Sequence, residues 1–249
     1  RPEAGATRHA HMTADKRENT GESGRSAGVP PAVPGASRSG DVSVRSRGRM
    51  PHIERPGAIY FVTFRLGDSL TGQMLQRLRR ERRRLEETAR QEGLPLRPED
   101  AWRINRAYRR QVEAALDQAH GNCRLKNSPV AQIVCNALQR FDGERYILGP
   151  WCLMPNHVHV LVRPLDGHAL PDILQSWKSY TAKAANRLLG RSGPFWQREY
   201  YDHVVRNEQE LQRCTDYIVS NPARACLAEW PWLGEGNMER LVGADEETG

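Results

Sequence analysis

The pattern of hydrophobic and polar positions defines a strand and then a long helix after residue 57. Residues 58–65 form a β-branched and aromatic run, AIYFVTFR, which predicts a strand. From 73 to about 92, apolar residues recur at helical spacing, which predicts a helix with one apolar stripe. Its other faces carry an arginine run, for which DNA binding and a solvated face are both open interpretations. The members of this run are Arg77, Arg79, Arg80, Arg82, Arg83 and Arg84.

Two more helices are predicted before residue 142. One spans about 99–119. The next has Ser128 at its cap and Pro129 at its first helical position, and both are typical of a helix start. Its predicted buried face is apolar throughout and consists of Val130, Ile133, Val134, Ala137, Leu138 and Phe141.

The second half of the chain alternates strands and helices. Strands are predicted at about 146–153 and 157–162, joined by a tight Met-Pro-Asn link at 154–156. A helix at about 170–189 and a short strand at about 200–205 follow.

A final helix is predicted from its capping residues. Asn207 caps it, and Glu210 completes a start that resembles a capping box. Pro222 disfavours helical geometry at Asn221, so we expect the helix to end there.

The order of these elements predicts an α+β fold. Without the last helix, the split β-α-β-β-α-β order of a ferredoxin-like antiparallel sheet is left. Residues of about 93–126 form a helical insertion between the first helix and the second strand of this unit. The last helix is then an extra C-terminal element.

Composition divides the chain into three parts. Residues 1–49 are rich in Gly, Ala, Ser, Pro and Arg, and they show no apolar periodicity. Such a segment cannot bury enough surface to offset its chain entropy, so it is predicted to be disordered. Upstream translated sequence and a basic tail are both open interpretations of it. We expect one folded domain over 50–230 and a C-terminal tail over 231–249.

Charge and cysteine usage narrow the function classes. The net charge of +7 and the isoelectric point near 9.4 favour a polyanionic partner, of which nucleic acid is the commonest. A ribosome-associated protein and a merely soluble basic protein are the weaker alternatives. The five cysteines show no CxxC spacing, which argues against a disulfide framework and a zinc ribbon. No apolar run approaches the roughly 18 residues of a membrane span, so we expect a soluble, cytoplasmic protein.

Two histidines on one predicted strand are candidate metal ligands. Side chains alternate along a strand, so His157 and His159 project to the same side. In that arrangement they can share one ion. A zinc site is an alternative that needs at least one more ligand, and a pair of ordinary histidines is the other.

Tyr217 and Asn221 are four residues apart, on one face of the final predicted helix. A tyrosine there is ordinarily a core-edge residue. A phenol is also a poor nucleophile, since its pKa is near 10, unless a metal polarises the phosphate that it attacks. An amide oxygen from Asn221 suits Mg²⁺ or Mn²⁺ as a third ligand.

Several separated motifs carry a family resemblance. The run WCLMPNHVHVLV at 151–162 is followed by WKSYTAKAANRLLG, PFWQREYYDHVVRN and DYIVSNPARA. In order and spacing these resemble the REP-associated tyrosine transposases, within the single-tyrosine HUH-type superfamily. The similarity covers about 50–227.

The resemblance implies a reaction and its residues. His157, His159 and Asn221 would bind Mg²⁺ or Mn²⁺, and Tyr217 would attack a phosphodiester of single-stranded, hairpin-bearing DNA. The products would be a 5′-phosphotyrosine link and a free 3′-hydroxyl, and a second 3′-hydroxyl could reverse the step in strand transfer. The resemblance further implies the ferredoxin-like fold, a bacterial nucleoid-associated protein, and a monomer or homodimer.

Cations and aromatic residues late in the chain predict DNA contacts. Cations hold phosphates, and flat rings stack on unpaired bases. Phe195 and Trp196 could equally close the core. The predicted DNA-binding residues are Lys178, Lys183, Arg187, Arg191, Trp196, Arg198 and Arg206.

Other assignments stay open from the sequence. Tyr180 is the second choice for the nucleophile, and His203 has a structural role or orients the substrate. The rival functions are a catalytically inactive, transposase-derived nucleic-acid-binding protein and a metal-dependent hydrolase of another substrate. The two main hypotheses differ on whether Tyr217 and the histidine pair converge on one metal ion.

Overall fold

The computed structural model describes residues 43–46, 51–90, 95–227 and 229–243. A two-stranded antiparallel ribbon comes first, formed by β1 (Ser43–Ser46) and β2 (Pro51–Glu54). Most of the segment predicted to be disordered, 1–42 and 47–49, lies outside the described residues. The short strand β1 falls within that predicted segment.

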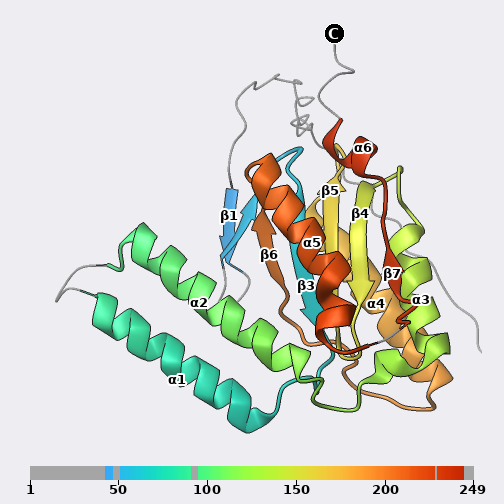
Figure 1. Cartoon of the computed structure of the whole chain (residues 1–249), viewed down its shortest axis with the longest axis horizontal. Coiled ribbons are helices and arrows are strands. Elements are labelled where there is room, and N and C mark those ends of the chain that lie inside the picture. Colours follow the sequence, from blue (N-terminus) through green and yellow to red (C-terminus); the bar gives the residue numbers. More distant parts are fainter. Residues whose placement is uncertain (1–42, 47–50, 91–94, 228, 244–249) are drawn as a thin grey trace, which may run out of the picture. The chain divides into compact units, whose positions relative to one another are not determined.

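The main sheet has five antiparallel strands in the order β6-β3-β5-β4-β7 (Figure 1). Its first four positions have the strand order of a split β-α-β-β-α-β unit, which confirms the predicted ferredoxin-like α+β fold. The strands are β3 (Tyr60–Arg65), β4 (Tyr146–Leu153), β5 (His157–Pro164), β6 (Tyr201–Val204) and β7 (Leu233–Gly234).

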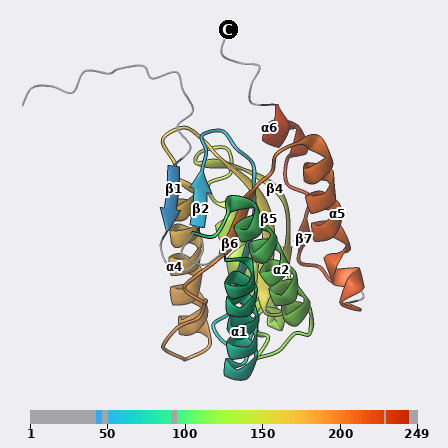
Figure 2. The same cartoon turned by 90° about the vertical axis from the view of Figure 1, so that its left-hand side faces the viewer.

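Helices cover both faces of this sheet (Figures 1 and 2). On one face lie α3 (Ser128–Gln139) and α4 (Leu170–Leu188), the two crossover helices. On the other lie α5 (Glu208–Arg224) and α6 (Met238–Val242). The insertion is larger than the predicted range of about 93–126, because α3 is the crossover helix and α1 (Gly72–Ala89) packs with α2 (Pro98–Asp117) as an inserted hairpin beyond the β6 edge. A single 3-10 turn, Arg124–Lys126, leads from α2 to α3.

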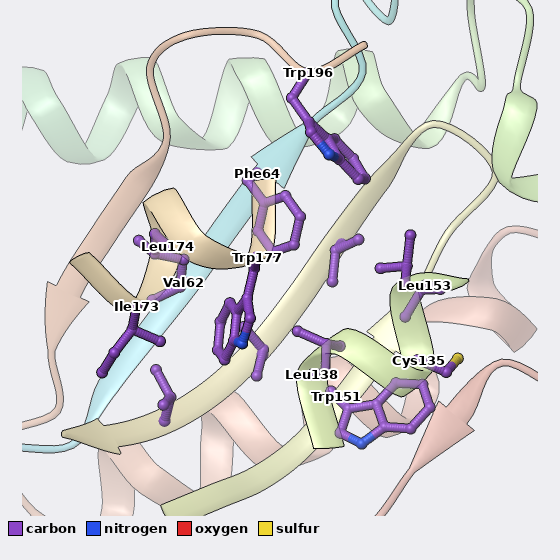
Figure 3. Packing of buried hydrophobic residues seen from close by; sticks show 14 of the residues in the cluster. Val62, Phe64, Cys135, Leu138, Trp151, Leu153, Ile173, Leu174, Trp177 and Trp196 are labelled. Carbon is purple, nitrogen blue, oxygen red and sulfur yellow. The ribbon is translucent and has the colours of Figure 1, made fainter. Parts of the chain in front are cut away.

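The larger core layer lies between the sheet and the two crossover helices. Alternate residues of β3 and β5 point into it, and Figure 3 shows Phe64 beside Trp177 of α4, with ring centroids 6.5 Å apart. The Trp177 indole N–H donates to the Tyr146 hydroxyl over 3.0 Å. A buried indole therefore keeps its hydrogen bond, as the apolar layer requires.

The opposite face of the sheet carries a smaller apolar layer. Phe61 of β3 and Leu161 of β5 pack there against Ile218 of α5, which is fully buried. Because residues alternate along β5, His157 and His159 share this face with Leu161. The histidine pair is thus covered by α5 and not by the crossover helices.

Two predicted helix ends differ from the structure. The cap of α3 is Asn127, whose side-chain oxygen accepts the Val130 N–H over 3.2 Å, and Ser128 is already helical. The last helix passes through Pro222 and ends at Arg224 instead of Asn221. Proline cannot donate a backbone hydrogen bond and its ring crowds the preceding turn. The helix nevertheless continues past it, and the Ala225 N–H bonds to the Asn221 carbonyl over 3.1 Å.

The segment predicted as a tail is partly folded. Its strand β7 pairs with β4, opposite Trp151 and Cys152, and Leu241 of α6 is fully buried under the second layer. These elements are two and five residues long, too short for a periodic pattern to reveal them. In the described part of the chain, no helix has the length and apolar character that crossing a membrane requires.

Candidate active site

The two candidate metal ligands meet in a buried position on β5. His157 is 1% exposed and His159 is 0% exposed, and their Nε2 atoms lie 2.9 Å apart. The rings stand nearly edge-on, with centroids separated by 4.6 Å. Two imidazole nitrogens thus point at one small volume.

A neighbouring amide fixes the orientation of His157. The Asn156 side-chain N–H₂ donates to the His120 carbonyl over 3.0 Å, which turns its oxygen toward His157 Nδ1 at 2.7 Å. An amide oxygen only accepts, so Nδ1 carries the proton. The Nε2 atom of His157 therefore presents a lone pair to the site.

A threonine on the next strand orients His159. The register of β3 and β5 sets Thr63 opposite His159, and the Thr63 hydroxyl lies 2.8 Å from His159 Nδ1. A hydroxyl donates or accepts as needed. When it accepts from Nδ1–H, both Nε2 lone pairs face the same point, as ligands of one ion require.

Burial keeps both imidazoles neutral. It lowers the pKa of His157 to about 3, and it lowers the pKa of His159 well below its usual range, with the neighbouring His157 adding to the effect. A neutral imidazole is the form that binds metal. The pair can therefore bind a cation at physiological pH without first losing protons.

Tyr217 of α5 lies against this pair. Its ring is edge-on to His159 at 5.1 Å between centroids and to Phe61 at 5.9 Å. Its hydroxyl is buried and has no hydrogen bond of good geometry within the described part of the chain. Asn221, one turn later and 2% exposed, is still near enough to lower the pKa of this phenol.

The net shift of the Tyr217 pKa is upward. Burial is the largest cause, and the negative charges of Glu113 and Asp117 add to it, while Arg224 opposes it. Arg224 stands 5.3 Å from the centre of the phenol ring. The phenol is therefore protonated in the free protein, and its activation needs positive charge close to the reacting phosphate.

Helix α2 brings further polar groups to the same face, which sequence reasoning missed. Arg109 donates to the Tyr201 hydroxyl over 2.6 Å, contacts His203 Nδ1 at 3.2 Å, and lies 3.8 Å from Glu113. Burial raises the pKa of Glu113 to about 7 although Arg109 opposes the shift. No sequence motif ties the insertion to β6, so only the fold reveals these contacts.

The donor set fits a divalent ion. Within the described residues, no third histidine, cysteine or carboxylate joins the pair to form a metal-binding group. A third protein ligand would therefore be a neutral oxygen, and Asn221 has the right chemistry one turn from Tyr217. The outer partners Thr63 and Asn156 were also missed, although Asn156 directly precedes His157.

Basic residues of α4 lie away from this site. Lys183 and Arg187 are exposed on α4, which covers the face of the sheet opposite the histidine pair. Lys178 is half-buried and donates to the Arg198 carbonyl over 2.7 Å. Burial and the nearby Arg65 charge lower its pKa to about 8.

The other predicted DNA-binding arginines lie outside α4, in the loops before and after β6. Arg191 donates to the Asn186 side chain and to the Pro194 carbonyl, so it shapes its own loop. Arg198 is exposed in the chain leading to β6. Arg206, beyond β6, is exposed and stands 5.9 Å from the ring centre of Trp102 of α2.

One predicted DNA contact is contradicted. Trp196 is 6% exposed, donates from its indole to the Thr181 hydroxyl over 2.8 Å, and packs edge-on against Phe64 at 4.9 Å. Its neighbour Phe195 is buried as well. Because an enclosed ring cannot stack on a base, Trp196 belongs to the core, the alternative left open from the sequence.

The rival tyrosine and the third histidine are also located. Tyr180 is 60% exposed on α4, across the sheet from the histidine pair. His203 of β6 contacts Phe61 at 5.4 Å and lies 3.6 Å from the Glu210 carboxylate. Burial and the Arg109 charge lower its pKa to about 4, so it is neutral despite that carboxylate.

Part of the chain is similar to known transposases. Residues 122–221 match the model of the family described as "Transposase IS200 like", a stretch that includes both histidines, Tyr217 and Asn221. A REP-associated tyrosine transposase of Escherichia coli K12 is 23% identical over 106 residues, covering 41% of this chain and 62% of that protein. A Haemophilus influenzae protein assigned the same name is 25% identical over 95 residues, covering 32% of this chain and 54% of that protein.

The chain thus spans little more than half the length of the curated relatives that it matches. The resemblance inferred from the motifs is confirmed by these matches. A solved REP-associated tyrosine transposase bound to a REP hairpin aligns with a TM-score of 0.43 and 16% identity, over 76% of this chain and 82% of that one. The fold assignment rests on the strand order and not on this alignment.

Proposed function

We propose that this chain, which matches the IS200-like transposase family model over residues 122–221, is a metal-dependent endonuclease and strand transferase for single-stranded, hairpin-containing DNA. The observation that carries this proposal is the contact between Tyr217 and His159, 5.1 Å between ring centroids, in one buried site. The proposed nucleophile and a proposed metal ligand come from separate elements, α5 and β5.

In the proposed reaction, the phenolic oxygen of Tyr217 attacks a DNA phosphorus. A bond forms between them, the bond from phosphorus to the 3′ oxygen breaks, and the phenolic proton is released. The leaving oxygen takes up a proton and becomes a 3′-hydroxyl, while the 5′ end stays linked to Tyr217 as a phosphotyrosine. Splitting the exchange at a covalent intermediate conserves the bond energy for rejoining.

The residues that would hold the cation are His157, His159 and Asn221. When bound, Mg²⁺ or Mn²⁺ supplies positive charge that polarises the phosphate and stabilises the departing oxygen. Thr63 and Asn156 support this role, because each fixes one imidazole at Nδ1 and leaves Nε2 turned to the site.

Rejoining follows the same path in reverse. A second DNA end brings its 3′-hydroxyl to the phosphotyrosine, its oxygen attacks the phosphorus, and the phenol of Tyr217 takes back a proton. The result is strand transfer without an external energy source. The REP-associated names of the curated relatives support a hairpin-bearing substrate.

The proposed DNA path also uses exposed cations outside the site. Lys183, Arg187, Arg198 and Arg206 are exposed and free to meet phosphates. Because Lys183 and Arg187 lie across the sheet from Tyr217, they would hold DNA at a distance from the cleaved bond. The hairpin is the part of the substrate that suits such a remote contact.

The test is a cleavage assay on hairpin DNA with single-stranded flanks, with Mg²⁺ or Mn²⁺. A label at the 3′ end should move with the protein as a covalent adduct, whereas a label at the 5′ end should leave on a free fragment. Tyr217→Phe should abolish the adduct, and the matched control Tyr180→Phe should keep it. An adduct that survives Tyr217→Phe would refute the nucleophile, and binding without any wild-type adduct would favour the inactive DNA-binding protein.

A further inference from the structure

A cavity of about 350 Å³ lies between the α1–α2 hairpin and the sheet. Its volume is within the range of ligand sites, about 300–1,000 Å³. Thr63, which contacts His159, is part of its wall, so the cavity adjoins the candidate active site. The α1–α2 hairpin precedes the stretch that the family model matches.

Arginines dominate the charge of this cavity. Two of its three glutamates already face an arginine, since Glu86 pairs with Arg82 at 2.8 Å and Glu113 lies 3.8 Å from Arg109. The third, Glu199, is exposed. The arginines that line the cavity are Arg65, Arg79, Arg82, Arg83 and Arg109.

Three of those arginines have no ion pair in the described part of the chain: Arg65, Arg79 and Arg83. Burial is the main cause that lowers the pKa of the Arg65 guanidinium of β3, and the charge of Arg79 on α1 is near enough to lower it further, against the opposing effects of Tyr108 and Glu199. Like charges held around one space favour an anion between them. The positions of Arg79 and Arg83, four apart on α1, direct both side chains to the same anion.

Aromatic side chains complete the lining. Tyr108 of α2 and Tyr200 before β6 are both half-buried in the cavity wall. A flat ring beside a cluster of cations is the combination that binds single-stranded nucleic acid, since the ring meets a base and the cations meet its phosphate.

We propose that this cavity binds one nucleotide of the single-stranded DNA next to the phosphate that Tyr217 attacks. The inference rests on the proposed function and adds a site to it. Arg79 and Arg83 contact the nucleotide's phosphate, and Tyr108 or Tyr200 contacts its base. The insertion thereby positions the single strand for attack by Tyr217. A nucleotide in a base-paired duplex could not enter the cavity in this way.

The test measures binding of a fluorescent hairpin with a single-stranded flank to the Tyr217→Phe protein, which cannot cleave. Arg79→Ala/Arg83→Ala should weaken binding about 10-fold or more and reduce the salt slope by about two, one for each lost phosphate contact. The control is Arg80→Ala/Arg84→Ala, with the same helix, spacing and charge loss but outside the cavity. It should change affinity by less than about 3-fold, since only general attraction is lost.

A blunt hairpin without the flank separates strand from hairpin binding. The cavity variant and the control should bind it alike. Equal losses for both double variants on the flanked hairpin would overturn the cavity proposal. If the wild-type protein still formed its covalent adduct in that case, the proposed function would stand without the nucleotide site. If the Tyr217→Phe protein did not bind the flanked hairpin at all, both the nucleotide site and the proposed function would be overturned.

Discussion

The ring of Tyr217 lies edge-on to the ring of His159, with centroids 5.1 Å apart. The two residues come from α5 and from β5, and the small apolar layer around Phe61 holds them together. A tyrosine that only closed the core edge would not need a buried hydroxyl without a full hydrogen bond. The contact is the arrangement that the proposed tyrosine mechanism requires.

The Thr63 hydroxyl should control metal affinity. Thr63→Val keeps the shape of the side chain but removes the partner of His159 Nδ1. Loss of such an outer partner typically costs about 10- to 100-fold in metal affinity. Calorimetric titration with Mn²⁺ would measure it, and Thr63→Ser, which keeps the hydroxyl, should bind nearly as wild type does. Equal affinities for the valine and wild-type proteins would contradict this role.

Glu113 should make stability depend on pH. Its pKa is raised from 4.5 to about 7 in the folded protein, so the folded state holds the proton more tightly than the unfolded state. The contribution of Glu113 to stability is therefore fully present below about pH 4.5 and is lost as the pH rises through about 7. Glu113→Gln should remove this loss and be more stable than wild type at pH 8, by about 2–3 kcal/mol. Urea unfolding at both pH values measures the difference, and parallel pH profiles would contradict it.

Trp196 should affect stability and not DNA binding. Trp196→Phe loses the hydrogen bond to Thr181 inside the core, which should cost about 1–3 kcal/mol of unfolding free energy. DNA affinity should stay within about 2-fold, since the ring is enclosed. The complementary variant Lys183→Ala/Arg187→Ala should lower DNA affinity and leave stability unchanged. If Trp196→Phe lowered DNA affinity and left the unfolding free energy unchanged, Trp196 would belong to the DNA-binding surface after all.

Gly236 should be essential for docking the C-terminal segment. Its φ is +63°, and an added Cβ would lie 2.3 Å from the Gly149 backbone. Gly236→Ala should therefore cost more than the about 1–2 kcal/mol of left-handed backbone strain. Gly167→Ala isolates that strain, because Gly167 has a φ of +79° and open space around it. Similar melting temperatures for both variants would show that the Gly236 contact can relax.

The sequence predicted most of what local patterns determine. Alternation placed His157 and His159 on one face, and the four-residue spacing placed Tyr217 and Asn221 on one helix. What it missed depends on pairing between distant segments. Thr63 meets His159 only through the register of β3 and β5, and Arg109 reaches β6 only through the packing of the insertion.

The misassigned residues have a related cause. A tryptophan beside arginines has the same local sequence whether it faces solvent or the core, and the hydrogen bond from Trp196 to Thr181 decides it. The end of the last helix was placed too early because the rule for residues before proline is local. In the structure, backbone hydrogen bonds continue the helix beyond Pro222, including the bond from the Ala225 N–H to the Asn221 carbonyl.

The central claim is that Tyr217 becomes covalently linked to DNA, and mass spectrometry of the digested adduct tests it most directly. Trypsin should release residues 214–224 as one peptide, in which Tyr217 is the single tyrosine, and residues 179–183 as another, which contains Tyr180. After nuclease trimming, we predict a 5′-nucleotide mass on the 214–224 peptide. The same mass on the 179–183 peptide, with 214–224 unmodified, would contradict the account.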